Sequence, residues 1–418
     1  MEVNQIFTPG SLPIYTYYNR ANLNLERKLL EAIETKGFIC SVSGPSKSGK
    51  TVLCESVVGK RSMLLITGGG ITTEFLFWQR LRSRLNMPNS RSDSKTSARA
   101  TEIQPQIKAN VQVPFFAKGE GSIGGKIGTN IGKAETASYD GPDSLTILEH
   151  LRDQAITLVI DDFHYIERAV QKSLAEQFKE AARAGNSIIV ISVSHRSDDA
   201  IRANPDLRGR VVCIDIPYWK PDELRIIPLK GLPLLNVSAD DAVIEDLVRE
   251  SISSPQLMQA ICLQLCRDLG IETTLRARAN ISLGQNQLYD LCRNTTVIAN
   301  CKAAFDIIIK GPKTRGSERR EFSLGGNKKG DIYYIILKAI ASGEPHLTLP
   351  YTIIKDRVEQ LVPNDNLRGS SIAVALSHMH KAVLNKLGED RVMEWDEERG
   401  TLNIPDPYFL YYLRWAEW

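Results

Sequence analysis

Residues 44–51 form a glycine-rich run whose residue types and spacing could bind phosphate groups. The run reads GPSKSGKT, follows the apolar stretch FICSVS and precedes a helical pattern. Backbone N–H groups at a helix N-terminus can surround a phosphate when a glycine-rich turn lets the backbone approach closely. We expect Lys50 to reach the β- and γ-phosphates of a nucleotide, and the Thr51 hydroxyl to bind Mg²⁺. The predicted phosphate-binding residues are Gly44, Pro45, Ser46, Lys47, Ser48, Gly49, Lys50, Thr51 and Val52.

Two adjacent carboxylates follow the apolar run LVI at residues 158–160. A phosphate-binding loop of this kind needs an acidic residue at the end of a neighbouring strand to hold magnesium. Asp161 is the predicted magnesium-side carboxylate, and Asp162 is the candidate for orienting or deprotonating an attacking water. The alternative for Asp162 is that it only caps the helix that follows.

Polar side chains also follow the apolar run SIIVISV at residues 187–193. If this strand lies between the strand before the glycine-rich loop and the acidic strand, the side chains at its carboxyl end point at the γ-phosphate. Ser194 and His195 are therefore candidate catalytic residues. Strand ends are often polar, so the alternative is that neither contacts a ligand.

The elements that must position these residues alternate between strands and helices. We predict strands at 38–43, 63–66, 156–160, 188–193 and 211–216, and helices at 51–59, 72–85, 144–152 and 168–184. This alternation predicts an α/β fold, with a parallel sheet and helices on both faces. An insertion at about 86–140, rich in Ser, Thr, Gly and Lys, interrupts the pattern, and its partial alternation favours an extended β-hairpin.

The pattern changes after residue 220. Residues 221–309 have helical spacing only, which predicts a small helical domain after a sheet domain at 1–220. Residues 310–330 form a linker, from Lys310 to Lys329, with seven Lys or Arg against two Glu. Residues 331–418 show three helical patterns and then two alternating segments around a turn, which is typical of a winged helix. The three helices are expected at 332–341, 352–361 and 371–387.

The composition excludes some classes of protein. A chain of 418 residues predicts two to three domains, and a net charge of +3 is too small to indicate a nucleic-acid-binding protein by itself. The seven cysteines are scattered and mostly in apolar stretches, so we expect reduced, buried thiols. The chain has no apolar run long enough to span a membrane and no signal-peptide pattern at its start, so we expect a cytoplasmic protein without membrane contact.

The order of GPSKSGKT, LVIDDFHYI, VISVSHR, a segment with Arg208 and Arg210, a helical lid and a winged helix resembles P-loop ATPases of the AAA+ class. The likeness is greatest to the origin-initiator-like and STAND-like branch of prokaryotic genomes. The resemblance implies ATP and Mg²⁺ as cofactors and a homo-oligomer. It also implies that Arg208 or Arg210 enters a neighbouring subunit's site. The alternative for each is an ordinary surface arginine.

The resemblance also assigns residues around the base and in the lid. The segment before the loop, LPIYTYYNR, is expected to contact the base through Tyr15 and Arg20. In the lid, AAA+ proteins often have a nucleotide-sensing arginine and STAND proteins a Gly-x-Pro. The stretch SSPQ stands at this place, and its Pro255 is in keeping with the STAND version. Asp161 and Asp162 replace the usual Asp-Glu pair, and the shorter second carboxylate favours slow hydrolysis.

Three functions remain open from the sequence. The first is an ATP-driven switch that assembles or engages a protein partner, with prokaryotic anti-phage or mobile-element defence as the implied setting. The second is a DNA-binding loader or transposition target-selection ATPase that forms ATP-dependent oligomers on DNA, and the third is a nucleotide-binding scaffold with negligible turnover. Residues 371–418 hold five Lys or Arg and eight Asp or Glu, so DNA would more readily contact the Lys310–Lys329 linker. The contrast between the basic linker and the acidic C-terminal residues favours protein partners over DNA.

Overall fold

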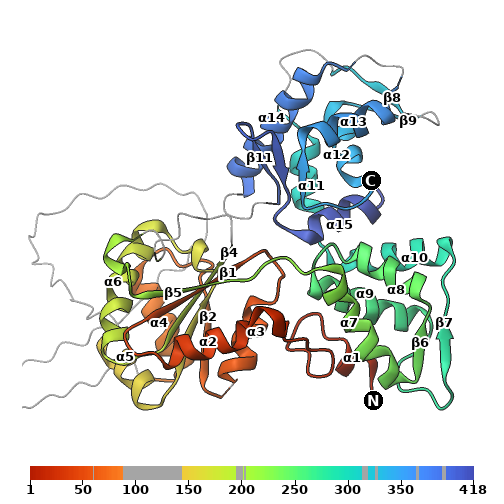
Figure 1. Cartoon of the computed structure of the whole chain (residues 1–418). Helices are drawn as coiled ribbons and strands as arrows, with labels where there is room; N and C mark the ends of the chain where they lie inside the picture. The colour runs from red at the N-terminus through yellow and green to blue at the C-terminus, as the bar shows by residue number, and fades with distance from the viewer. Residues whose placement is uncertain are drawn as a thin grey trace, which may run out of the picture.

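A computed structural model describes residues 1–59, 61–87, 144–193, 201, 204–312, 319–324, 328–363, 367–387 and 392–418. We name three parts of it: the sheet unit (20–219), the helical unit (1–8 and 220–301) and the C-terminal unit (302–418). In Figure 1 they lie at the lower left, at the lower right and at the top. The predicted hairpin in the insertion lies outside the described residues.

The sheet unit contains five parallel strands in the order β2-β3-β4-β1-β5. They are β1 (Ile39–Gly44), β2 (Met63–Thr67), β3 (Thr157–Asp161), β4 (Ile188–Val193) and β5 (Val211–Asp215). Each lies within one residue of its predicted position, and the α/β prediction is confirmed. β4 lies between β1 and β3, so the carboxyl ends of the loop-bearing strand and the acidic strand face the same edge with one strand between them.

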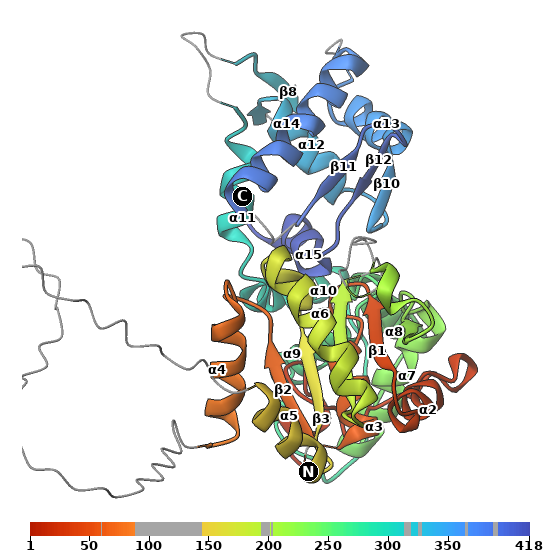
Figure 2. The same cartoon turned by 90° about the vertical axis from the view of Figure 1, so that its left-hand side faces the viewer.

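Helices cover both faces of this sheet, as Figure 2 shows. One face packs against α2 (Leu25–Glu34) and α3 (Lys50–Val58), through side chains such as Leu29 and Cys54. The other packs against α4 (Glu74–Arg84), α5 (Ser144–Asp153) and α6 (Arg168–Arg183), through Phe77 and Phe178 among others. Both faces are therefore dry, which explains why the central strands read as continuous apolar runs. Short 3-10 turns are η1 (Ala21–Leu23), η2 (Phe163–Tyr165) and η3 (Pro205–Leu207).

The helical unit contains a small sheet that the helical spacing did not indicate. Its helices are α7 (Pro221–Gly231), α8 (Asp241–Glu250), α9 (Pro255–Asp268) and α10 (Gln285–Thr295), with η4 (Leu232–Leu235) and η5 (Thr296–Ile298). Between them β6 (Val237–Ala239) and β7 (Ala279–Ile281) pair in parallel. The prediction of helices alone is wrong here, because three-residue strands are too short to show an alternating pattern.

The first residues of the chain belong to the helical unit. Val3 and Ile6 of α1 (Val3–Ile6) are buried in its core, and the Val3 N–H donates to the Glu272 carbonyl over 2.9 Å. A sheet domain that starts at residue 1 is therefore wrong. The chain crosses from the helical unit to the sheet unit along residues 9–19 and returns along 216–220.

The C-terminal unit combines α12 (Ile332–Ala341), α13 (Tyr351–Leu361) and α14 (Gly369–Leu387) with a three-stranded antiparallel sheet. It also contains α11 (Lys302–Ile309), which packs against α12 and α14, so the predicted end of the helical domain at 309 is wrong (Figure 1). The strands are β10 (Thr348–Pro350), β11 (Glu394–Asp396) and β12 (Thr401–Asn403), in the order β10-β12-β11, and α15 (Pro407–Trp415) follows. All three predicted helices start within two residues of their expected positions. The linker prediction for 310–330 is wrong in part, since β8 (Phe322–Leu324) and β9 (Lys328–Gly330) form an antiparallel hairpin.

The helical and C-terminal units share one continuous apolar cluster, whereas the two faces of the large sheet have clusters of their own. Six of the seven cysteines are buried and Cys213 is exposed, so burial of all the thiols is not observed. Among the described helices, none has the length and apolar character needed to cross a bilayer.

Candidate nucleotide-binding site

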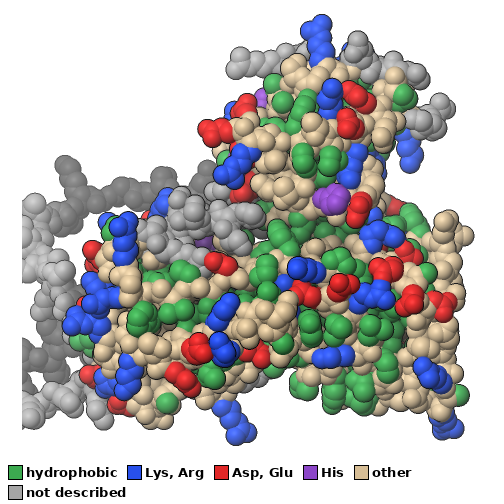
Figure 3. Space-filling view, in the orientation of Figure 1, with side chains coloured by type: hydrophobic (Ala, Val, Ile, Leu, Met, Phe, Trp, Pro, Cys, Tyr) green, Lys and Arg blue, Asp and Glu red, His purple; other side chains and the backbone are tan. Residues whose placement is uncertain are grey.

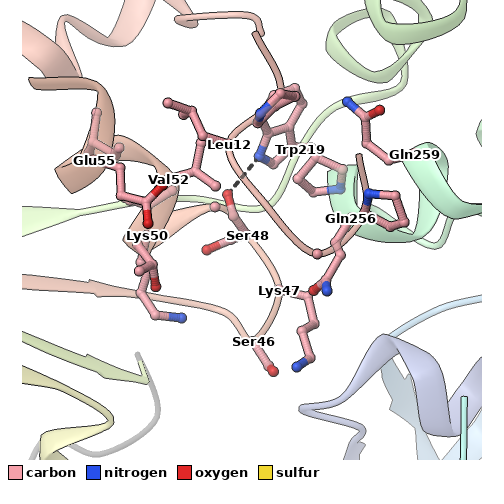
Figure 4. Close-up of a pocket in the computed structure, with 18 of the residues that line it drawn as sticks. Leu12, Ser46, Lys47, Ser48, Lys50, Val52, Glu55, Trp219, Gln256 and Gln259 are labelled. Atoms are coloured by element: carbon pink, nitrogen blue, oxygen red, sulfur yellow. Dashed lines mark hydrogen bonds between the residues drawn. The ribbon is translucent and has the colours of Figure 1, made fainter. Parts of the chain in front are cut away.

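The loop between β1 and α3 has the backbone of a phosphate-binding turn. Gly49 adopts φ +92° and Lys47 φ +61° immediately before α3 begins at Lys50. Glycine takes this left-handed conformation without a steric penalty, so Gly49 lets the chain turn sharply into the helix. The indole Nε1 of Trp219 donates to the Ser48 carbonyl over 2.9 Å and helps to fix the loop (Figure 4). The first N–H groups of α3 therefore face the space that the loop encloses.

Lys50 is the buried cation of the site. Its ammonium donates to the carbonyls of Gly44, over 3.1 Å, and Pro45, over 2.7 Å. Burial lowers the pKa of Lys50 to about 8, against the opposing effect of the carboxylates of Asp161 and Asp162. An anionic ligand would stabilise the charged form of this amine.

Thr51 and Asp161 meet at the edge of the sheet. The Thr51 hydroxyl donates to Asp161 Oδ2 over 2.5 Å, and Asp161 Oδ1 accepts the N–H of Asp162 over 2.9 Å. A hydroxyl and a carboxylate held together are the hard oxygen ligands that Mg²⁺ prefers. The residues present therefore fit the metal that the sequence implies.

Asp162 lies in the same cavity in a left-handed conformation, with φ +53°. It stands at the N-cap position of η2, but its side chain makes no capping hydrogen bond. Burial, and then the charge of Asp161, raise the pKa of the Asp162 carboxyl. Both effects make this carboxylate a stronger base, which suits a group that orients or deprotonates water.

These residues line a cavity of about 520 Å³. Its wall includes the phosphate-binding loop, part of the N-terminal segment, α9 of the helical unit and three residues of the C-terminal unit. Figure 4 shows Lys50 and Ser46 on the loop side, and Gln256 and Gln259 on the side of the helical unit. The site is therefore formed where all three units meet.

Of the two residues predicted to contact the base, Tyr15 lies outside the cavity wall and Arg20 lines it. Tyr15 is 44% exposed and is absent from the cavity wall, which Thr16, Tyr17 and Tyr18 line instead. Arg20 lines the cavity, yet its guanidinium is 3% exposed and occupied by other groups. It donates to Glu223 and to the carbonyls of Pro217 and Tyr218, each over 3.0 Å. The base contact predicted for Tyr15 therefore falls outside this cavity wall and stays a prediction, and Arg20 joins the N-terminal segment to the start of the helical unit.

Pro255 lines the cavity as the first residue of α9. Ser254 before it caps this helix through Leu257, and its hydroxyl lies 3.5 Å from the Lys47 carbonyl of the phosphate-binding loop. The lid stretch SSPQ therefore contacts the loop directly.

The remaining predicted residues lie away from the cavity or cannot be placed. Ser194 and His195 lie outside the described residues, although Val193 at the end of β4 lines the cavity. Arg208 is exposed, Arg210 is half-buried, and neither is part of the cavity wall.

Several lining residues were not predicted. Trp219 and Gln259 stand in apolar helical or connecting stretches without a motif. Glu394 and Asp406 reach the cavity from the C-terminal unit, and no sequence signal connects them to residues 44–51. Lys47 extends toward that unit, with its ammonium 6.0 Å from the centre of the Tyr408 ring.

The strand order, the phosphate-binding loop and the acidic strand define a P-loop fold of the AAA+ type. In sequence, the chain matches no protein-family model and no curated protein. In structure it is similar to the Walker-type ATPase PABY2304 of Pyrococcus abyssi, with 15% identity, a TM-score of 0.50, and 93% of this chain and 94% of that chain covered. It is also similar to Cdc6p from Pyrobaculum aerophilum (13% identity, TM-score 0.42, 98% and 96% covered). A third similar structure is the Thermotoga maritima RuvB Holliday junction branch migration motor (14%, 0.38, 91% and 91%).

The lowered pKa of Lys50 predicts proton uptake when a nucleotide binds. Near pH 7 the amine is mostly charged, whereas near pH 9 it is mostly neutral in the ligand-free protein. Phosphate groups favour the charged form, so we expect ATP binding to take up close to one proton near pH 9 and far less near pH 7. Calorimetric titration in two buffers of different ionisation enthalpy measures this number. A Lys47→Gln variant should retain the uptake, and no uptake near pH 9 in the wild type would contradict the role of Lys50.

Proposed function

We propose that the chain is a magnesium-ATP-dependent switch in which the nucleotide controls the contact between the phosphate-binding loop and the C-terminal unit. Slow hydrolysis would restore this contact, and the C-terminal unit released by ATP would engage a protein partner. The observation that carries the proposal is the presence of Glu394 and Asp406 in the wall of the phosphate-binding cavity.

The two carboxylates make the C-terminal unit sensitive to the charge of a ligand. Glu394 lies in β11, and Asp406 caps α15 by accepting the N–H of Tyr408 over 2.9 Å. A nucleoside triphosphate brings several negative charges into the same cavity. Like charges at short range in a partly buried site repel by several kcal/mol at most. ATP, with its additional phosphate, would therefore oppose this docked arrangement more strongly than ADP.

A short path connects the phosphate-binding loop to the C-terminal unit through residues 250–254. Ser254 contacts the Lys47 carbonyl at one end, and Glu250 binds Arg414 of α15 at the other. Between them Ile252 and Ser253 adopt φ +49° and +55°. A side chain other than glycine is strained in the left-handed region, most of all a β-branched one such as Ile252, so these two residues favour another conformation when a contact at either end is lost. The path therefore supports a two-state element that nucleotide can bias.

Hydrolysis is assigned to Asp162, with Thr51 and Asp161 as the residues that would hold Mg²⁺. The bound ion would neutralise phosphate charge. Asp162 has the raised pKa of a base, and its short side chain reaches less far than the glutamate that AAA+ hydrolases usually carry. This difference supports slow turnover.

Assembly is the part of the proposal that concerns neighbouring copies. Arg208 is exposed on the turn before β5, outside the cavity of its own subunit. This position supports a contact with the site of a neighbouring subunit, and Arg210 is the second candidate. The helices α12 to α14 and the three strands of the C-terminal unit support a winged-helix domain. Residues 221–301, joined by residues 1–8, support a helical lid.

A DNA-binding ATPase is the second candidate function. The observation that favours it is the basic hairpin β8–β9, which lies on the C-terminal unit away from the acidic strand β11 (Figure 1). In this second function, nucleotide would control assembly on DNA.

Asp406→Asn tests the switch. Asparagine can still cap α15, so the change removes one negative charge with little effect on the helix. We expect about tenfold tighter ATP binding and a smaller gain for ADP, measured by calorimetric titration. Asp396→Asn is the matched control, because Asp396 carries the same charge on β11 but is not part of the cavity wall. Unchanged or weaker ATP binding by the Asp406 variant would refute the proposed repulsion.

A further inference from the structure

The hairpin β8–β9 forms a fixed surface on the C-terminal unit. Its strands pair with Phe322 opposite Gly330, Ser323 opposite Lys329 and Leu324 opposite Lys328. Phe322 is 6% exposed, and Gly330 lies so close to the Tyr334 ring of α12 that a Cβ atom there would collide with it. The hairpin is therefore held against α12 by close packing, although the sequence predicted a solvated linker.

Alternation along the hairpin distributes its basic side chains over both faces. Lys328 shares a face with Phe322 and Leu324, which is the face turned toward α12, whereas Lys329 and Ser323 are on the outer face. Lys328 and Lys329 are both exposed, and Arg320 lies with its guanidinium 4.8 Å from the centre of the Phe322 ring. Figure 3 shows blue side chains in this area, at the right-hand edge of the C-terminal unit.

A fourth cation comes from α12. The Lys338 ammonium lies 3.6 Å from the centre of the Trp418 ring and 5.6 Å from that of Tyr334. Aromatic faces hold an ammonium in place without cancelling its charge. Burial, and then the nearby charge of Lys328, lower the pKa of Lys338. The two cations are thus close enough to repel, and an anion between them would relieve this repulsion.

Arg319 does not belong to this surface. Its guanidinium pairs with Asp331 over 2.7 Å and stacks 4.7 Å from the centre of the Tyr333 ring. It therefore fixes the base of the hairpin. Arg320, Lys328 and Lys329 are exposed and Lys338 is half-buried, and we name these four cations the hairpin surface.

We propose that the hairpin surface binds the phosphate backbone of duplex DNA without reading its sequence. The aromatic rings nearby are already covered, since Lys338 lies over Trp418, and Trp418 contacts Phe305 and Tyr334. These contacts compete with the stacking of an unpaired base on the rings, which favours backbone contacts with a duplex. The acidic strand β11 lies on another side of the unit and would repel the duplex, so it restricts how the DNA can lie (Figure 1).

The proposal deepens the second candidate function and rests on it. It differs from binding by α14, the third helix of the C-terminal unit, which carries Lys381 and Lys386. On α14, His378 bonds the Tyr333 hydroxyl and His380 accepts the N–H of Trp395. These contacts turn both histidines inward, toward the unit itself.

The test measures binding of the full chain to a short fluorescent duplex of arbitrary sequence by anisotropy, over a series of salt concentrations and without nucleotide. About four phosphate contacts predict a slope of log K against log salt of roughly −3.6. The double variant Lys328→Gln, Lys329→Gln should bind more than about tenfold more weakly near 0.1 M salt, with a slope smaller by about 2. Both side chains are exposed, so the fold should be unaffected.

The matched control is Lys381→Gln, Lys386→Gln, which removes the same charge from exposed positions of α14. It should bind DNA like the wild type. If the control loses binding and the hairpin variant does not, the hairpin surface is the wrong site, while DNA binding itself stands. If the wild type binds no duplex at low salt, both the surface and the DNA-binding function fail. A single strand of the same sequence that binds more tightly than the duplex would overturn the backbone assignment.

Discussion

Lys50→Ala is expected to reduce nucleotide turnover by about a thousandfold, since a positioned cation of this kind contributes on the order of 10²–10³ to the rate. The ammonium is buried behind the loop and has the carbonyls of Gly44 and Pro45 as its partners. Its charge is therefore already desolvated before a nucleotide binds. Interactions of such a charge with phosphate oxygens are stronger than those of an exposed lysine.

The control for this prediction lies three residues earlier. Lys47 is exposed on the same loop, so Lys47→Gln should reduce turnover by no more than about tenfold. Phosphate release gives the rate, calorimetry gives the affinity, and circular dichroism shows that both variants are folded. Equal losses in the two variants, or full activity of Lys50→Ala, would mean that the loop does not use Lys50 to bind phosphate.

Arg414→Met is expected to destabilise the protein by about 2–4 kcal/mol, because it removes two of the four side-chain donors to the buried carboxylate of Glu250 and leaves it Arg249 and Trp415. Glu250 is 1% exposed, and its oxygens accept from Arg414 Nε over 3.2 Å, Arg414 Nη2 over 3.1 Å and Trp415 Nε1 over 2.9 Å. Arg414 also donates to the carbonyls of Ala341 and Gly343. One side chain thus joins the helical unit, α12 and α15.

Arg293→Met is the matched comparison on the same boundary. Arg293 pairs with Glu417 over 2.7 Å, but these side chains are 46% and 67% exposed, so losing the pair should cost less than about 1 kcal/mol. Urea denaturation measures both variants. Adding Glu250→Gln to Arg414→Met should recover part of the stability, since the buried carboxylate, which keeps Arg249 as its only cation among the described contacts, is then neutral. A cost for Arg414→Met no larger than that for Arg293→Met would refute the importance of the buried network.

The parts of the fold that were predictable are those with strong local patterns. The central strands β1, β3 and β4 are buried on both faces and therefore appear as unbroken apolar runs. GPSKSGKT has a fixed spacing because its backbone must surround a phosphate. These local patterns are sufficient to predict that Lys50, Thr51 and Asp161 lie together.

The parts that were missed depend on packing between distant segments. Asp406 lies more than 350 residues beyond the phosphate-binding loop, and only the docking of α15 brings it to the cavity. Arg20 looks like a base contact from its position before the loop, but its guanidinium donates to Glu223 and two carbonyls instead. The strands β6 to β9 have three residues each, too few to distinguish alternation from chance.

The position of α1 has a mechanical consequence. Because α1 packs in the helical unit, two stretches of backbone, 9–19 and 216–220, join that unit to the sheet unit. Arg20 binds them to each other where they run together, through the carbonyls of Pro217 and Tyr218. A unit joined by a single connecting segment can rotate about several axes. A unit joined by two connecting segments that are bonded to each other can rotate mainly about the axis through them. The cavity lies beside this line, so a small rotation of the helical unit about the line would widen or narrow the cavity.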